Sequence, residues 1–369
     1  MTKAAELAKM GEVLTNSQIG GRRNIIINGA MQVAQRGTSE TGVNSSGYSD
    51  APDRFRIAYE GSSSQFTVSQ DTNAPAGFKT SYKIQCTTAD SSLAATSQVG
   101  LLQRIEAQNL QHLKYGLSSA EKVTLSFYVK SNTTGTYAVN LYSQDGNRII
   151  GTTYSISSAD TWEQKILTFD GDTGGTINND NGKGIEVKWF ISAGSTYTAT
   201  DNTSWGAYAD GKIAYGHAVD LADSTSDNWA ITGVQLEVGS QATPFEHRSF
   251  GEELDLCQRY YYKQADGSEN ASQSVGVAFM ESSSVVVCCI DLPTTMRATP
   301  SNVSSSVTDG FQFYRNGAAD NFTDTYIANA HPNIFTFFNH TQVSGTAGQA
   351  GSIKLNSSAT SYIAVDAEL

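Results

Sequence analysis

Alternation of hydrophobic and polar residues with a period of two runs through most of the chain from Asn24 onward. Neighbouring side chains of a β-strand point to opposite faces, so this alternation predicts strands with one buried face. In one run the hydrophobic residues alternate with the polar Gln235 and Glu237. Turn-rich segments separate the runs, as in a β-sandwich or jelly roll. The clearest runs are residues 123–129, 185–191 and 232–238.

A second block of alternating segments fills the last hundred residues. Its candidate strands share hydrophobic residues at every second position and are separated by polar turns. They cover residues 275–279, 285–290, 311–314, 333–338, 352–355 and 362–365. The chain has no visible internal repeat and no long heptad array, which excludes a long coiled-coil or collagen-like shaft.

Two segments follow the helical period instead. Residues 3–14 carry apolar residues at spacings of three and four, and a pair of glycines follows. A capping box at Ser249 and Glu252 begins a second helix over residues 250–261. Helices this short are not stable alone, so their apolar stripes are expected to dock on another subunit or particle. The stripe residues are Leu7, Met10 and Leu14 in the first helix, and Phe250, Leu254, Cys257 and Tyr261 in the second.

These patterns predict an all-β protein in which a short helix joins two β-sandwich or jelly-roll domains and another short helix precedes them. The length of 369 residues suits such an organisation. The expected parts are an N-terminal helical anchor (1–23), a jelly-roll domain (24–247), a linking helix (248–265) and a C-terminal β-sandwich domain (266–369).

Composition narrows the class of partner. The formal net charge of −12 and the pI near 4.8 argue against nucleic acid, which requires clustered Lys and Arg. No apolar run approaches the roughly 18 residues of a membrane span, and no signal-peptide core is visible, so neither membrane insertion nor secretion is expected. The four cysteines form no disulfide framework and no CxxC pair, which indicates free thiols and folding in a reducing cytoplasm.

Motifs of catalysis are missing from the sequence. It contains no GxSxG elbow, no HExxH motif and no phosphate-binding glycine loop, and its five histidines have no metal-ligand spacing. The chain is therefore predicted not to be an enzyme and to need no cofactor. A carboxylate pair suited to glycoside hydrolysis could still occur among its 36 acidic residues.

One acidic turn-rich region is a candidate for a structural calcium ion. Asp170, Asp172 and Asp180 lie in the segments DGDTGG and NNDNG, and calcium prefers such oxygen ligands. The EF-hand pattern fails because Gly174 stands where a third side-chain ligand belongs. An ordinary Asx-rich turn between strands is the alternative interpretation.

Aromatic residues in polar loops are the candidates for glycan binding. Residues 195–218 are too polar and too rich in glycine for a core strand, and their aromatic side chains could stack on sugar rings. The same side chains could instead cover the sandwich or a neighbouring subunit. In the C-terminal domain three residues at a turn are further candidates. The candidates are Tyr197, Trp205, Tyr208 and Tyr215 in the first domain, and Tyr314, Arg315 and Asn316 in the second.

Three stretches resemble tail-fibre and related appendage proteins of marine bacteriophages, especially podoviruses of the cyanophage type. The first is AAELAKMGEVLTNSQIGGRRNIIINGAMQVAQRGTS, which leads to APDRFRI. The second, and the most specific, is WAITGVQLEVGSQATPFEHRSFGEELDLCQRYYYK, and the third is the terminal SYIAVDAEL. They cover both ends of the first domain, the linking helix and the C-terminus.

This resemblance implies a homotrimeric virion appendage that is made in the host cytoplasm. Its N-terminus would attach to a tail adaptor, a nozzle or other virion proteins, and its distal domain would contact the host. The first domain would be similar to carbohydrate-binding modules of the jelly-roll type. The leading hypothesis is therefore a short trimeric tail fibre that binds host surface polysaccharide during adsorption. The alternatives are a purely architectural head or neck decoration (a whisker) and a polysaccharide depolymerase.

Overall fold

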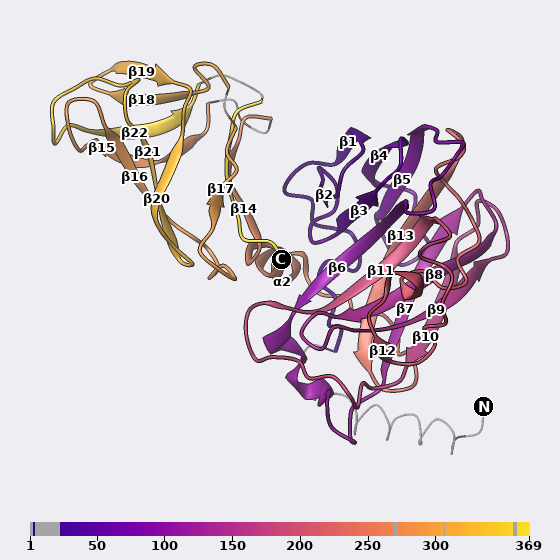
Figure 1. The fold of residues 1–369 in the computed structure, drawn as a ribbon. Coiled ribbons are helices and arrows are strands. Elements are labelled where there is room, and N and C mark those ends of the chain that lie inside the picture. Colours follow the sequence, from indigo (N-terminus) through magenta and orange to yellow (C-terminus); the bar gives the residue numbers. More distant parts are fainter. Residues whose placement is uncertain (1–2, 4–22, 269, 271, 306, 357–359) are drawn as a thin grey trace. The chain divides into compact units, whose positions relative to one another are not determined.

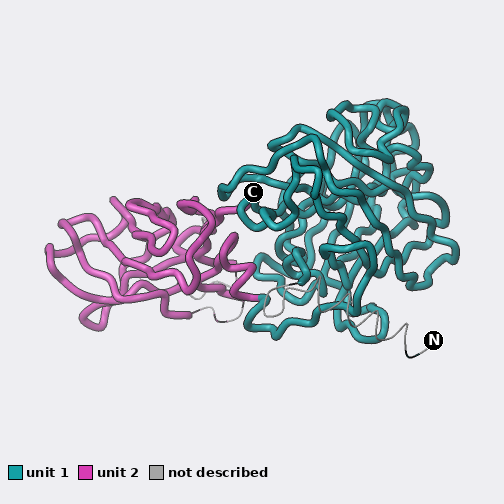
Figure 2. Tube along the Cα trace, turned by 90° about the horizontal axis from the view of Figure 1, so that it is seen from below, with its two compact units in different colours: residues 1–253, 369 teal, residues 254–368 magenta. Residues whose placement is uncertain are grey.

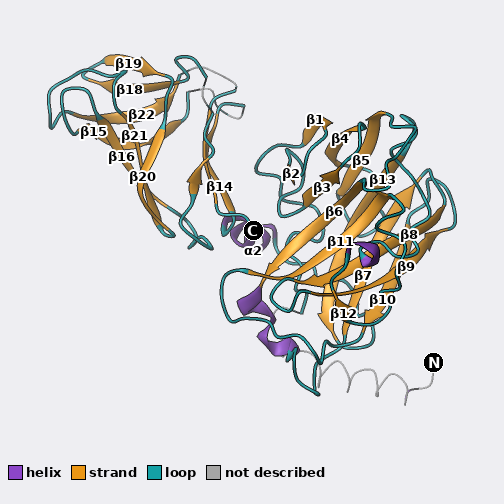
Figure 3. Ribbon diagram, viewed as in Figure 1, coloured by secondary structure: helices purple, strands orange, loops and turns teal. Residues whose placement is uncertain are grey.

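The computed structural model describes residues 3, 23–268, 270, 272–305, 307–356 and 360–369. The chain forms two compact units, Met1–Glu253 with Leu369 (unit 1) and Leu254–Glu368 (unit 2), coloured separately in Figure 2. Both are built of antiparallel sheets, which confirms the all-β prediction (Figure 3). The predicted N-terminal helix, with Leu7, Met10 and Leu14, lies outside the described residues. Among the residues that are described, no helix is long and apolar enough to cross a membrane.

Unit 1 is a β-sandwich of a six-stranded and a seven-stranded sheet (Figure 1). The six-stranded sheet has the order β1 (Ser39–Val43), β4 (Gln65–Asp71), β5 (Ser81–Thr88), β13 (Asn228–Val238), β7 (Val123–Ser131) and β10 (Glu163–Phe169). The seven-stranded sheet has the order β12 (Gly206–Ala207), β9 (Arg148–Ile156), β8 (Gly135–Ser143), β11 (Lys183–Ala193), β6 (Gln98–Glu106), β3 (Arg56–Glu60) and β2 (Gly47–Tyr48). Two short 3₁₀ segments, Ala107–Leu113 and Asp210–Lys212, lie in the connections.

The core of unit 1 lies between these sheets. Phe127 of β7 meets Trp189 of β11 edge to face, with ring centroids 5.8 Å apart, and both side chains are fully buried. The alternating residues 123–129 and 185–191 therefore supply the two facing layers, as their pattern predicted.

Unit 2 pairs a small sheet with a large one. The three-stranded sheet has the order β14 (Tyr261–Asp266), β23 (Tyr362–Asp366) and β17 (Ser301–Asn302). The seven-stranded sheet has the order β19 (Ala318–Phe322), β18 (Phe311–Arg315), β22 (Ala350–Leu355), β15 (Ser274–Met280), β16 (Val286–Asp291), β21 (Ile334–Asn339) and β20 (Tyr326–His331). Phe311, Phe313, Phe335 and Phe337 form its buried core with Ile363 and Val365 of the small sheet.

The helix α2 spans Phe250–Gln258 and is shorter than predicted. Its capping box is present, because the Ser249 backbone N–H donates to Glu252 Oε2 at 2.9 Å and the Glu252 N–H donates to Ser249 Oγ at 3.3 Å. Tyr261 does not belong to the helix but begins β14, which pairs with β23 inside the segment predicted as the linking helix. Tyr261 stands four residues after Cys257, so the helical spacing appeared to continue beyond Gln258, where α2 ends. Tyrosine is common in strands, and the spacing alone could not place this boundary.

The predicted apolar stripe of this helix is not one exposed surface. Phe250 is 56% exposed and Leu254 is partly exposed, but Cys257 and Tyr261 are buried within the chain. Cys257 and Tyr261 are therefore core residues of the single chain and do not offer a surface to a symmetry mate.

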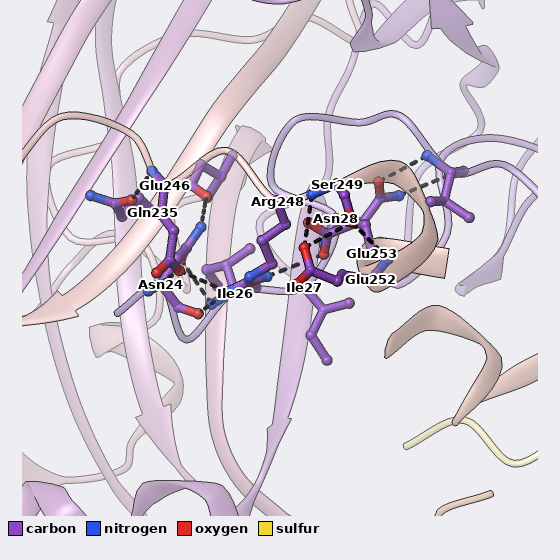
Figure 4. Close-up of polar contacts among 12 residues, drawn as sticks. Asn24, Ile26, Ile27, Asn28, Gln235, Glu246, Arg248, Ser249, Glu252 and Glu253 are labelled. Carbon is purple, nitrogen blue, oxygen red and sulfur yellow. Dashed lines mark hydrogen bonds and ion pairs between the residues drawn. The ribbon is translucent and has the colours of Figure 1, made fainter. Parts of the chain in front are cut away.

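A buried polar network fixes residues 24–28, at the start of the described part of unit 1, to the residues that enter α2 (Figure 4). The Arg248 guanidinium donates to the carbonyl oxygens of Asn24 and, at 3.1 Å, Ile26. It also lies 3.2 Å from a carboxylate oxygen of Glu246 and 3.2 Å from one of Glu253. More than 200 residues separate the two segments in sequence, so this network joins the beginning and the end of the unit 1 chain.

Gln235 and Glu237 of β13 are buried, although strict alternation suggested polar positions facing away from the core. They do face away from the sandwich core, but residues 243–246 cover them. The backbone N–H of Glu246 donates to Gln235 Oε1 at 2.8 Å, and the Thr243 hydroxyl donates to Glu237 Oε2 at 2.6 Å. Residues 243–246 therefore form a second, polar layer on this strand.

Candidate functional site

The outer face of the seven-stranded sheet of unit 1 gathers charged and aromatic side chains. Odd-numbered residues of β11, such as Val187 and Trp189, fill the core, so Glu186 and Lys188 point outward. Cross-strand pairing extends this outward face from β2 to β8. We call the following residues the sheet-face site: Tyr48, Arg56, Arg104, Tyr142, Glu186, Lys188 and Tyr208.

Two neighbouring cross-strand rows make up most of the site. In the first, Tyr48 pairs with Arg56, Arg56 with Leu102, and Leu102 with Lys188. In the second, Glu186 lies between Arg104 and Tyr142. Directly opposed side chains of antiparallel strands have Cβ atoms about 4.5–5.5 Å apart. The two rows therefore form one continuous patch on a rigid sheet.

The charged groups of the site are only partly paired. Arg104 Nε donates to Glu186 Oε2 at 3.0 Å. Lys188 is almost fully buried, and its ammonium donates to Gln98 Oε1 at 2.7 Å and lies 4.9 Å from the centre of the Phe190 ring. Burial lowers the pKa of Lys188, because the charged form loses hydration.

Arg56 differs from the other cations of the site. Within the part of the chain that the structure describes, its side chain has no hydrogen-bond or ion-pair partner. Burial lowers the pKa of Arg56, and the nearby Arg104 guanidinium lowers it further. Cationic character is thus concentrated here on a protein whose formal net charge is −12.

Tyr142 and Tyr208 form the aromatic part of the site. Their ring centroids lie 5.1 Å apart at an interplanar angle of 59°, and Tyr208 is 37% exposed. The Tyr142 hydroxyl donates to Asn147 Oδ1 at 2.9 Å, and the Tyr208 hydroxyl to Asp210 Oδ1 at 3.2 Å. Burial raises the pKa of both tyrosines, and Asp210 adds to the effect at Tyr208, so both hydroxyls stay protonated. The pair offers ring surface in a fixed orientation.

The loop of residues 195–218 brings only one of its predicted aromatic residues to this patch. Tyr197 is buried against Phe190 and Ile213, and its hydroxyl donates to Glu60 Oε2 at 3.0 Å. Tyr197 is therefore a packing residue that holds the loop on the outer sheet face, and its prediction as an exposed sugar platform was wrong.

The other predicted aromatic residues of the loop have different surroundings. Trp205 is partly buried, meets Tyr115 edge to face at 5.6 Å, and donates from Nε1 to the Asp170 carbonyl at 2.6 Å. Tyr215 is partly exposed. Tyr208 alone contributes to the sheet-face site as we define it.

The candidate residues of unit 2 lie at the end of β18 and in the turn to β19. Tyr314 is 40% exposed, and the Lys354 ammonium lies 4.2 Å from the centre of its ring. Arg315 is held by Asp320, to which Nη1 donates at 2.9 Å, and Asn316 is exposed with a φ of 51°. Arg315 is thus a turn-fixing residue, whereas Tyr314 and Asn316 remain accessible.

The predicted calcium residues follow the turn interpretation. Asp172 is fully buried and accepts from Arg148 Nε at 2.8 Å and from the Gly174 N–H at 3.0 Å. Asp180 accepts from the Gly182 N–H at 2.8 Å, and Asp170 pairs with Lys122 at 2.6 Å. Among the described residues, no group of three or more His, Cys, Asp or Glu side chains is arranged to hold a metal ion. The Arg148 guanidinium neutralises the Asp172 carboxylate, as a calcium ion would have done.

Sequence reasoning missed most of the sheet-face site. Tyr142 and Glu186 occupy the polar phase of strands whose other phase is hydrophobic, and alternation alone does not distinguish a binding face from ordinary surface. Aligning the outward residues of neighbouring strands would have revealed the patch, but strand order in a sandwich does not follow sequence order. The loop of residues 195–218 carries the stronger signal in the sequence because its aromatic residues are close together along the chain.

The chain matches no protein-family model and no curated protein. Among solved structures it is similar to the enzymatically active domain of tailspike protein 4 of bacteriophage CBA120, with 14% identity over 58% of this chain and a TM-score of 0.32. That match spans only 21% of the tailspike chain. A putative sugar-binding protein from Bacteroides thetaiotaomicron (12% identity, 59% of this chain, 100% of that chain) has a TM-score of 0.31. A family 11 carbohydrate-binding module from Clostridium thermocellum (11% identity, 56% and 99% coverage) has a TM-score of 0.27. None of these likenesses is close enough to assign a function.

Proposed function

We propose that the chain is a non-catalytic glycan-binding protein and that the sheet-face site contacts the sugar. The observation that carries this proposal is the Tyr142–Tyr208 pair beside the hydrogen-bonding groups of Glu186 and Arg104. Sugars present C–H faces that pack on aromatic rings and hydroxyl groups that pair with fixed polar side chains. A rigid sheet holds these groups at low entropic cost.

Loss of either tyrosine ring is expected to weaken glycan binding about tenfold or more, since truncating a central aromatic contact residue typically costs above 1 kcal/mol. Tyr208→Ala and Tyr142→Thr remove the rings, and threonine keeps the strand preference of residue 142. Affinity electrophoresis and calorimetry with host polysaccharide measure the change.

Tyr128→Thr is the matched control for these variants. Tyr128 is a partly exposed strand tyrosine of β7, in the six-stranded sheet of unit 1 and outside the sheet-face site. It is expected to bind like the wild type. If Tyr128→Thr abolished binding while Tyr142→Thr did not, the sugar contact would lie on the other sheet of unit 1.

We propose further that the chain is a short trimeric tail fibre of a bacteriophage virion, anchored through its N-terminal residues and exposed to the host surface. The sequence stretches that resemble marine phage appendages support this role. The outer face of the large sheet of unit 2 supports association, because it exposes apolar side chains in register across strands. Tyr314, Val277, Phe279, Phe338 and Tyr326 form this apolar sheet face.

The assembled protein is expected to have a mass near three times 39.5 kDa in analytical ultracentrifugation. Val277 is 81% exposed, so Val277→Asp leaves the fold of the single chain intact. An unpaired carboxylate buried between subunits is costly, and association is expected to weaken about tenfold or more. Asn316→Asp, at an exposed turn, adds the same charge and serves as the control. A wild type that sediments as a monomer at working concentration would refute the trimer.

Two other functions remain as alternatives. The same apolar sheet face would suit an architectural head or neck decoration, which would form a folded oligomer that binds no host glycan. A depolymerase would release reducing ends from purified host polysaccharide, whereas a binding protein leaves the polymer intact. Immunolabelling of the chain on intact particles separates a tail from a head position.

A further inference from the structure

We propose that the sheet-face site takes an anionic sugar, one carrying a carboxylate or sulfate group, and that Arg56 is the residue that binds this group. This inference rests on the glycan binding proposed above and names its ligand class. The charge-bearing oxygens of uronic acids and of sulfated sugars share the acceptor geometry that a guanidinium recognises.

The surroundings of Arg56 disfavour its charged form unless an anion is bound nearby. Arg56 is the cross-strand partner of Leu102, and Arg104 lies two residues further on the same face of β6. Such diagonal neighbours lie about 7–8 Å apart. Glu186, which could have neutralised this pair, is engaged by Arg104 at 3.0 Å. Glu186 lies on β11, on the far side of β6 from Arg56, and no carboxylate among the described residues pairs with Arg56, so its positive charge is uncompensated by contact.

Hydrogen-bond donors converge beside Arg56. Tyr48 is its direct cross-strand partner, and the Arg36 guanidinium carbon lies 5.2 Å from the centre of the Tyr48 ring. The Tyr48 hydroxyl, at 3.4 Å, and Arg104 Nη1, at 2.5 Å, donate to the same backbone oxygen of Leu369 within unit 1. The phenol and the Arg104 guanidinium thus already bind one oxygen acceptor, that of Leu369, whereas Arg56 has no acceptor among the described residues.

The direction of the pKa shift agrees with this geometry. Burial and then Arg104 lower the pKa of Arg56, whereas Glu186 and Tyr48 raise it only in part. A bound anion would remove the repulsion from Arg104. The protein as a whole, with 36 acidic against 24 basic residues, repels polyanions, so retention of one requires a local contact. At physiological salt the screening length is about 8 Å, which confines the attraction to the site itself.

Matched pairs of polymers test the charge requirement directly. Dextran sulfate is compared with dextran, and polygalacturonate with its carboxyl-reduced polymer, using calorimetry on the full-length protein. We expect binding to at least one charged polymer, no binding to its neutral partner, and weaker binding as salt is raised. The sulfated and carboxylated pairs distinguish the two sources of the anionic group.

Arg56→Gln is expected to weaken binding of the charged polymer about tenfold to hundredfold, because hydrogen bonds to charged groups contribute strongly. Arg56→Lys keeps the charge but loses the bidentate fork, so an intermediate loss is expected. Lys122→Gln is the control, since Lys122 is an exposed cation of unit 1 that pairs with Asp170 outside the site. Circular dichroism verifies that each variant is folded.

The outcomes separate this inference from the function on which it rests. Equal binding of charged and neutral polymers, with Arg56→Gln unchanged and Tyr142→Thr defective, would overturn the anionic ligand but keep the glycan site. Equal losses in Arg56→Gln and Lys122→Gln would indicate non-specific attraction and would also overturn it. No binding of any host or model glycan by the folded wild type would remove the glycan function as a whole.

Discussion

Replacing Arg248 with methionine is expected to lower the free energy of unfolding of unit 1 by about 3–5 kcal/mol, the usual cost of removing one partner of a buried ion pair. The Arg248 side chain is only 7% exposed. It neutralises Glu246 and Glu253 together and satisfies the carbonyl oxygens of Asn24 and Ile26. Methionine fills much of the volume, so the loss reports the charge and the hydrogen bonds.

Tryptophan fluorescence during urea denaturation measures this loss for unit 1 alone. All four tryptophans (Trp162, Trp189, Trp205 and Trp229) lie in that unit. Lys114→Met is the control, because Lys114 forms an exposed ion pair with Glu121 and is expected to change stability by no more than about 1 kcal/mol. Similar losses in both variants would contradict the role of Arg248 as the buried centre of the network.

A double variant separates charge from packing. Glu253 Oε1 also accepts the backbone N–H of Asn28 at 2.6 Å, and glutamine can keep this bond. Adding Glu253→Gln to Arg248→Met removes one uncompensated carboxylate, so it is expected to restore part of the lost stability. If the two substitutions were simply additive, electrostatic coupling between the two side chains would be negligible.

The buried strands were the predictable part of the fold. Residues 123–129 and 185–191 became the centres of β7 and β11 because facing sheets require one apolar phase on each strand. The alternation of β13 was harder to interpret, since Gly233, with a φ of 62°, lies in a register shift between Thr232 and Gln235. A bulge inserts an extra residue and changes which phase faces the core.

The site was less predictable because its residues meet only after the strands are ordered. Arg56, Arg104, Tyr142 and Glu186 come from four strands that are neighbours in the sheet but not in the sequence. Tyr197 shows the converse error, since a polar loop appeared exposed until it folded back onto Phe190. Local pattern indicates which residues are polar, whereas tertiary packing decides which of them are accessible.

Acid is expected to destabilise unit 1 through His217, by about 3 kcal/mol between pH 6.5 and pH 4. Burial lowers the pKa of His217 from its ordinary 6.5 to about 4, although the carbonyls of Val219 and Ile191 oppose the shift. The ring is neutral in the folded state, and its Nδ1 accepts the Ala138 N–H at 3.1 Å. The unfolded chain binds a proton below pH 6.5, whereas the folded chain resists until about pH 4. Stability therefore falls as pH falls through this window, by about 1.4 kcal/mol per unit of pKa difference.

His217→Asn keeps an acceptor for the Ala138 N–H but cannot bind the proton. Its stability at neutral pH is expected to be lower, since contacts of the ring with Tyr137 and Phe190 are lost. The informative quantity is the slope: between pH 6.5 and pH 4.5 the variant should lose markedly less stability than the wild type. Comparing the two proteins cancels the carboxylates that titrate in both, including Asp220, whose pKa burial raises. Parallel curves for wild type and His217→Asn would mean that the imidazole is protonated in the folded protein, and the loop of residues 195–218 would then have to admit water to it.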